Sequence, residues 1–148
     1  MNVEDLLDAK LFQPNMRARK KWEAITELAE FLLHEDRIDS LDDFLNDVKA
    51  REKLVSTGVG SGIAIPHAIS KSVIKPSIVF GRSDEGIEYG SIDNQPVNLV
   101  FLFAIPDTYG DKEYLRTLSS VARLLVHEEI RIKLKEATNF KAVQAALR

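Results

Sequence analysis

The sequence predicts an α/β domain in which helices pack against a central block of strands, and two observations lead to this class. Apolar residues recur at helical spacing near both ends of the chain, whereas the middle is rich in β-branched and aromatic residues. One middle segment, 97–105, is almost wholly apolar, as a strand covered on both faces is. The 148 residues therefore suit a single layered domain over 1–148 with a sizeable core.

Two helices are expected in the N-terminal block. Apolar residues recur at helical spacing from Arg19 to His34, which indicates the first. Ser40 with Asp43 resembles a capping box, with aspartate in the usual glutamate position, and predicts that a second helix opens there.

The middle block predicts strands at Ile63–Pro66, Ser77–Gly81 and Val97–Ile105, with a brief alternation at Ile87–Tyr89. Three helices are expected to follow. The first is a long amphipathic helix over 115–125, the second covers 130–137, and the last is a short helix capped by Thr138.

Composition and charge exclude several classes of function. The net charge of -3 and the lack of a basic stripe argue against nucleic-acid binding. The absence of cysteine removes disulfides and thiol chemistry. The acidic N-terminus lacks the features of a signal peptide, and the longest apolar run is far short of the roughly 20 residues of a membrane helix. We expect a cytoplasmic protein that neither enters membranes nor binds nucleic acid.

The segment 56–68 delivers one histidine, His67, after a glycine-rich turn and directly after Pro66. Proline fixes its own φ angle and favours an extended residue before it. Gly58, Gly60 and Gly62 allow close backbone packing or positive φ angles. The pattern predicts an imidazole held at a defined angle.

Other readings of these residues are weaker. The glycine spacing is G-x-G-x-G, and an extended run follows where a nucleotide-binding loop requires a helix. His34 and His127 lie apart and lack metal-ligand spacing, so both are expected as solvated helix-end residues. No nucleophile elbow of a serine hydrolase is present, and neither a metal nor another cofactor is expected.

His67 remains as a candidate nucleophile. A neutral imidazole attacks phosphorus and carries the group as a phosphoramidate, and a pKa near 6.5 leaves much of it neutral at cell pH. This role requires a ring that a donor can reach and whose nitrogens are not both engaged. The alternative is a structural histidine with satisfied hydrogen bonds at a strand end.

Three segments carry a family resemblance: 51–67, 92–106 and 115–125. The first closely resembles the active-site segment of fructose/mannitol-type enzyme IIA domains of the bacterial phosphoenolpyruvate-dependent phosphotransferase system. The second is most similar to the nitrogen-regulatory branch of that family, and the similarity extends over essentially the whole chain.

The resemblance implies a central, mostly mixed β-sheet with helices on both faces. It implies phosphorylation of His67 on Nε2, with Arg51 as a cation near the phosphoryl group. Many members carry a second active-site histidine where this chain has Tyr114. A tyrosine hydroxyl donates a hydrogen bond but supplies no positive charge. Arg116 is a candidate for that charge if its side chain faces the site.

The expected reaction is in-line transfer from a phosphohistidine of a histidine-containing phosphocarrier protein, without a metal, to His67. Arg51 is expected to neutralise the phosphoryl oxygens. Weaker candidates for contacts to these oxygens are the hydroxyls of Thr57 and Ser61 and the backbone N–H groups of 60–62, which include Gly60 and Gly62.

The docking surface is expected to be apolar. Its possible contributors are Ile63, Ile65 and Ala68, although core burial is favoured for both isoleucines.

Three functions remain open from the sequence. The first is a regulatory phosphorelay protein whose phosphorylation state tunes its binding to target proteins. The second is a sugar-transport enzyme IIA that passes the group to an enzyme IIB. The third is an interaction module that keeps the fold without phosphoryl transfer, which the tyrosine at position 114 suggests.

Overall fold

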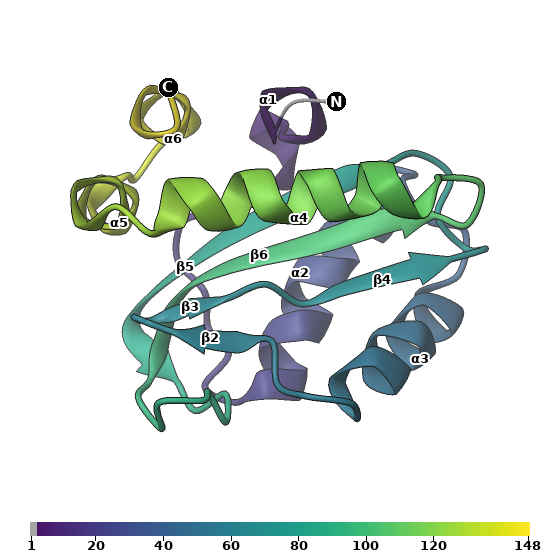
Figure 1. The fold of residues 1–148 in the computed structure, drawn as a ribbon, viewed down its shortest axis with the longest axis horizontal. Helices are drawn as coiled ribbons and strands as arrows, with labels where there is room; N and C mark the ends of the chain where they lie inside the picture. Colours follow the sequence, from purple (N-terminus) through teal and green to yellow (C-terminus); the bar gives the residue numbers. More distant parts are fainter. Residues whose placement is uncertain (1–2) are drawn as a thin grey trace.

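A six-stranded mixed sheet lies between two layers of helices in the computed structural model, which describes residues 3–148 (Figure 1). The strand order is β1-β5-β6-β3-β2, and β4 also pairs with β6. β1 runs parallel to β5, β5 antiparallel to β6, β3 and β4 parallel to β6, and β2 antiparallel to β3. The strands are β1 (Phe12–Gln13), β2 (Gly58–Gly60), β3 (Ile63–Ala64), β4 (His67–Ser70), β5 (Ser77–Ile87) and β6 (Val97–Pro106).

The helices divide between the faces of this sheet. One face packs against α2 (Lys21–His34) and α3 (Leu41–Glu52). The other packs against the remaining α-helices, and a short 3-10 helix, η1 (Ala9–Leu11), precedes β1. These helices are α1 (Val3–Leu6), α4 (Asp111–Leu125), α5 (Glu128–Glu136) and α6 (Phe140–Ala146). The expected mixed sheet with helices on both faces is confirmed.

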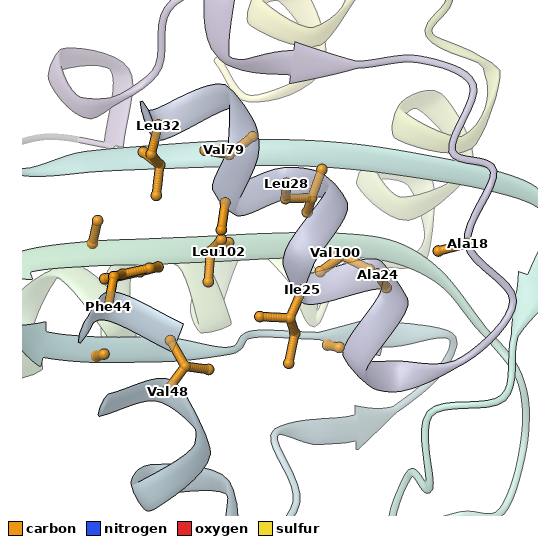
Figure 2. Close-up of a cluster of buried hydrophobic side chains, with 14 of the residues drawn as sticks. Ala18, Ala24, Ile25, Leu28, Leu32, Phe44, Val48, Val79, Val100 and Leu102 are labelled. Carbon is orange, nitrogen blue, oxygen red and sulfur yellow. The ribbon is translucent and has the colours of Figure 1, made fainter. Parts of the chain in front are cut away.

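The strand β6 forms the centre of both cores. Because side chains alternate along a strand, Val100, Leu102 and Ala104 point to the α2–α3 face, where Figure 2 shows Leu102 near Leu28 and Phe44. The alternate residues Leu99, Phe101, Phe103 and Ile105 face the other layer. All seven are fully buried, which explains why this segment reads as a continuous apolar run.

Most of the expected elements are present. The first helix lies at α2, and the Ser40 hydroxyl accepts a hydrogen bond of 3.2 Å from the Asp43 N–H at the start of α3. The expected cap of the last helix is wrong by one residue. Asn139, rather than Thr138, caps α6, because the Asn139 side chain accepts a hydrogen bond of 2.9 Å from the Ala142 N–H.

The strands differ more from expectation. β3 stops at Ala64 rather than Pro66, and β5 continues through Ile87, joining two segments that the sequence suggested separately. The short strands β1, β2 and β4 were not expected. β1 and β4 are defined by pairing with distant strands rather than by their own pattern, as in the register of β4 along β6 from His67 opposite Phe103, whereas β2 pairs with the adjacent β3.

Candidate active site

His67 opens β4, and the backbone orients its ring. β3 and β4 pair with β6 in the same register, with Ile63 opposite Leu99 and His67 opposite Phe103. The two strands therefore follow one another along the same edge of β6. The His67 Nδ1 lies 2.9 Å from the carbonyl oxygen of Ile65. A backbone carbonyl only accepts, so it calls for a proton on Nδ1.

Arg51 reaches His67 from the last turn of α3. Its Nε–H donates to His67 Nε2 at 3.0 Å, and its Nη1 donates to the carbonyl oxygen of Val55 at 3.0 Å. Because an arginine is always a donor, Nε2 carries the lone pair and Nδ1 carries the proton. This is the tautomer that a nucleophilic Nε2 requires.

The ring is nevertheless enclosed in this arrangement. Only 4% of the residue is exposed, and both ring nitrogens have hydrogen-bond partners. A nucleophilic role requires a reachable ring with a free nitrogen, and this requirement is not met while Arg51 stays on Nε2. Arg51 itself is half-buried at the surface, so Nε2 is engaged by one arginine side chain and not by a backbone group.

Burial also keeps the imidazole uncharged. It lowers the pKa of His67 from the ordinary 6.5, the hydrogen bond to the Ile65 carbonyl opposes this shift, and the charge of Arg51 lowers the pKa again. The charge of Glu52 acts in the raising direction and comes last in size. The neutral, nucleophilic form therefore persists to lower pH than in an exposed histidine.

Tyr114 packs against the histidine from α4. The two ring centroids are 5.5 Å apart, with an angle of 52° between the ring planes. Burial raises the pKa of the Tyr114 hydroxyl, while the charge of Arg51 and a hydrogen bond with it act in the opposite direction. Tyr114 thus lies beside both Arg51 and His67. Arg116 is exposed and two positions further along α4, which turns its side chain by about 200° from Tyr114, away from the site.

The glycine-rich turn lies elsewhere. Gly60, Ser61 and Gly62 all have positive φ angles and form the tight connection between β2 and β3. The N–H groups of Gly60 and Ser61 donate to the side chains of Ser91 and Asp93 at 3.2 Å each. Four register positions along β6, about 13 Å, separate the end of this turn from His67. The structure does not bring these candidates together with the imidazole.

Thr57 is close to the site but engaged in a buried cluster. Its hydroxyl hydrogen-bonds the carboxylate of Glu52 and lies 2.7 Å from the Tyr89 hydroxyl. The Glu52 carboxylate also pairs with Lys21 at 3.0 Å. Glu52, Tyr89 and Lys21 were not predicted from the sequence. The signal for Glu52 was present, because it continues the buried stripe of α3 through Phe44 and Val48 at four-residue spacing.

The expected docking residues are largely inside the molecule. Ile63 and Ala68 are each 3% exposed, and Ile65 is half-buried. Apolar surface near the site instead comes from Leu54 and Val55, which follow Arg51, and from Leu115, which follows Tyr114.

Within residues 3–148, no three histidine or acidic side chains gather as a metal site would require, and none of the helices combines the length and apolar character needed to cross a bilayer.

Comparison with known families shows which family has this sequence. Residues 5–148 match the family model described as "Phosphoenolpyruvate-dependent sugar phosphotransferase system, EIIA 2". The chain belongs to this EIIA family. It is therefore a phosphoryl-transfer component of the phosphotransferase system, and the expected family is confirmed.

Relatives of two kinds resemble this EIIA domain. A fructose-specific EIIABC component of Bacillus subtilis is 37% identical over 143 residues, which are 97% of this chain and 22% of the Bacillus protein. The chain thus spans about a fifth of that relative's length. A nitrogen regulatory protein of Bradyrhizobium diazoefficiens is 33% identical over 151 residues, covering 99% of this chain and 95% of the relative.

Solved structures give the same result. The crystal structure of the nitrogen regulatory protein IIA-Ntr of Neisseria meningitidis superposes with a TM-score of 0.89 at 29% identity, covering 97% of each chain. Mannitol enzyme IIA of Escherichia coli, solved in complex with phosphorylated enzyme IIB, matches with a TM-score of 0.81 at 25% identity. That match covers 96% of this chain and 98% of the solved one.

Proposed function

We propose that this EIIA domain carries a phosphoryl group on Nε2 of His67, received from a phosphohistidine of a histidine-containing phosphocarrier protein. One observation carries the proposal. The Nδ1–H of His67 donates to the Ile65 carbonyl, which leaves the lone pair on Nε2, and that atom faces the guanidinium of Arg51. An unprotonated nitrogen beside a permanent cation is the arrangement that accepts and then neutralises a phosphoryl group.

Transfer begins when Arg51 leaves Nε2. The Nε2–P bond then forms while the N–P bond of the donor breaks, and the electron pair of that bond returns to the donor's ring. The Nδ1 proton stays on its hydrogen bond to Ile65, so the positive charge on the His67 ring is opposed by the phosphoryl group itself. Arg51 moves from the ring nitrogen to the phosphoryl oxygens, where a guanidinium binds oxyanions in its fork.

The partner would dock on apolar surface next to these groups. Leu54 and Val55 are 79% and 56% exposed, and Leu115 is 56% exposed. They replace Ile63 and Ala68 as the proposed contact residues, since those two are buried. Small apolar patches of this kind suit the transient encounters of a relay.

A regulatory role is the first candidate for the phosphorylated protein. The likeness to nitrogen regulatory proteins over almost their whole length supports it. In this role the phosphorylation state of His67 controls binding to target proteins.

A sugar-transport role is the second candidate, with an enzyme IIB as the acceptor of the group. It is supported by the identity to the fructose-specific relative and by the mannitol enzyme IIA whose complex with phosphorylated enzyme IIB has been solved.

The test is incubation with phosphoenolpyruvate, enzyme I and the phosphocarrier, followed by mass spectrometry. We expect an acid-labile gain of one phosphoryl group that His67→Ala abolishes. No gain in the wild-type protein would favour a silent interaction module, and a gain that survives His67→Ala would refute the site. Addition of enzyme IIB domains then separates the two roles, because only the transport role predicts rapid loss of the group to one of them.

A further inference from the structure

A buried carboxylate lies directly behind Arg51. The Glu52 side chain is 2% exposed, and its oxygens accept hydrogen bonds from several donors. The Thr57 N–H donates at 3.4 Å, the Thr57 hydroxyl donates as well, and Lys21 pairs with the carboxylate at 3.0 Å. The hydroxyl of Tyr89 lies 3.4 Å from the same oxygen that the Thr57 hydroxyl contacts.

The bonds between Glu52 and Thr57 join the two ends of the loop 52–57. The closed loop contains Val55, whose carbonyl oxygen holds the Nη1 of Arg51 at 3.0 Å. Both the backbone and the side chain of Arg51 are therefore held in place. Its backbone precedes Glu52 in α3, and its guanidinium is bound to the loop that Glu52 closes.

Thr57 also connects the loop to the imidazole. Its carbonyl oxygen accepts a hydrogen bond of 2.9 Å from the N–H of Ile65, and the carbonyl oxygen of Ile65 accepts one from the Nδ1–H of His67. Through Thr57, Glu52 is thus linked to both groups: to the guanidinium of Arg51 by way of the loop and the Val55 carbonyl, and to the ring of His67 by way of Ile65.

We propose that Glu52 is a positioning residue for phosphoryl transfer, which fixes Arg51 relative to His67 by binding Thr57. This inference rests on the function proposed above. Glu52 touches neither reacting nitrogen, and it acts through Thr57 and the loop.

Stability alone does not account for a carboxylate at this place. Glu52 continues the apolar stripe of α3, where a hydrophobic side chain would pack against the sheet without an ion pair. Buried ion pairs are often replaced by hydrophobic residues with no loss of stability. What an apolar residue would lack are acceptors for the N–H and the hydroxyl of Thr57, and with them the closure of the loop.

The direct test is Glu52→Gln. The amide keeps the size of the side chain but has one acceptor oxygen and a donating NH₂ group, which faces the donors Lys21 and Thr57. Glu27→Gln is the matched control. Glu27 on α2 also ties a helix to a loop by accepting from the N–H groups of Arg17 and Ala18, in a part of the molecule outside the site.

A second pair of variants keeps the inference testable if Glu52→Gln folds poorly. Thr57→Val removes the hydroxyl at nearly constant volume, whereas Thr57→Ser keeps it. Two measurements are made on each folded variant. The first is kcat and KM for transfer from the phosphocarrier. The second is the rate at which the Arg51 Nε–H exchanges with solvent, measured by NMR on the unphosphorylated protein.

We expect Glu52→Gln and Thr57→Val to lower kcat by about tenfold or more, because a small misplacement of a catalytic group has effects of this size. KM for the phosphocarrier should change little, and the Arg51 Nε–H should exchange faster. Thr57→Ser and Glu27→Gln should resemble the wild-type protein in both measurements.

The inference is overturned if Glu52→Gln retains wild-type kcat and exchange, if Thr57→Ser is as impaired as Thr57→Val, or if Glu27→Gln is as impaired as Glu52→Gln. A wild-type protein that accepts no phosphoryl group would refute the proposed function instead. In that case the exchange of the Arg51 Nε–H alone decides whether Glu52 positions this side chain.

Discussion

Replacing Arg51 with methionine is expected to change two reactions of His67 in opposite directions. The guanidinium covers the Nε2 lone pair at 3.0 Å, so its removal should speed acylation of the ring by a small reagent such as diethyl pyrocarbonate. The same removal takes away the cation that neutralises the phosphoryl oxygens, so phosphoryl acceptance should slow.

The magnitude follows from the bonds that Arg51 makes. A hydrogen bond from a charged donor contributes about 1.5–3 kcal/mol. Loss of one such bond to the transferring group corresponds to a decrease of about tenfold to 150-fold in rate. Release of Nε2 from the same kind of bond should raise the acylation rate by about tenfold or more.

Both rates are best measured at pH 8. Arg51 is one of the groups that lower the pKa of His67, so its loss raises that pKa. At pH 8 the ring stays largely neutral in both proteins, and the comparison reports the guanidinium rather than protonation. Phosphoryl acceptance is followed by quenched-flow transfer from the labelled phosphocarrier, and acylation by absorbance of the modified imidazole.

Arg37→Met is the matched control, because Arg37 is also a partly buried arginine but is bonded to Ser77 and Asp8, away from the site. It should leave both rates near those of the wild-type protein. A decrease of both rates in Arg51→Met, or an unchanged rate of phosphoryl acceptance, would refute the assignment of Arg51 as both cover and neutralising cation.

Five further outcomes are expected. Because burial and then Arg51 hold the pKa of His67 below 6.5, phosphoryl acceptance should keep its plateau rate to pH values below 6.5, and a profile that bends above 6.5 would contradict this. The folded state binds fewer protons at this residue than the unfolded chain, so its contribution to the free energy of unfolding should decrease as pH falls below about 6.5. Tyr114→Phe should slow transfer by about tenfold in the same kinetic assay, as expected for loss of one hydrogen bond between its hydroxyl and the charged Arg51. Phe101→Ala, at a fully buried ring stacked 4.4 Å from that of Phe80, should lower the free energy of unfolding by about 3–5 kcal/mol in urea titrations. Asn139→Ala should lower it by about 1 kcal/mol and Thr138→Ala by clearly less, and equal effects would contradict the observed cap.

Elements with a strong periodic pattern could be predicted from the sequence. The helix α2 and the strand β6 were recognised because burial on one stripe, or on both faces, is written directly in the order of apolar residues. The strand β4 could not be recognised in this way. Its four residues, His-Ala-Ile-Ser, become a strand because β6 lies beside them.

The candidate site shows the same division. His67 was identified from its setting and from the family resemblance, and Arg51 from the resemblance alone. Gly60 and Ser61 were expected near His67 because they are close in sequence, but the chain runs straight along β6 after the turn and separates them in space. Which hydroxyl or amide faces the histidine depends on strand register, which local patterns do not encode.

Glu52 illustrates a different limit. Its position on the buried stripe of α3 was visible in the sequence, but partners that make burial of a carboxylate tolerable come from α2 and from Tyr89, two residues beyond the end of β5. A charged residue on an apolar stripe indicates that such partners exist without naming them. Their identity required the fold.

The orientation of the imidazole depends on a peptide group rather than on a side chain. The N–H of Ile65 donates to the Thr57 carbonyl oxygen. The carbonyl oxygen of Ile65 accepts a hydrogen bond from the Nδ1–H of His67. Any amino acid at position 65 presents that same oxygen. The choice of reactive nitrogen is therefore insulated from a change of side chain at position 65.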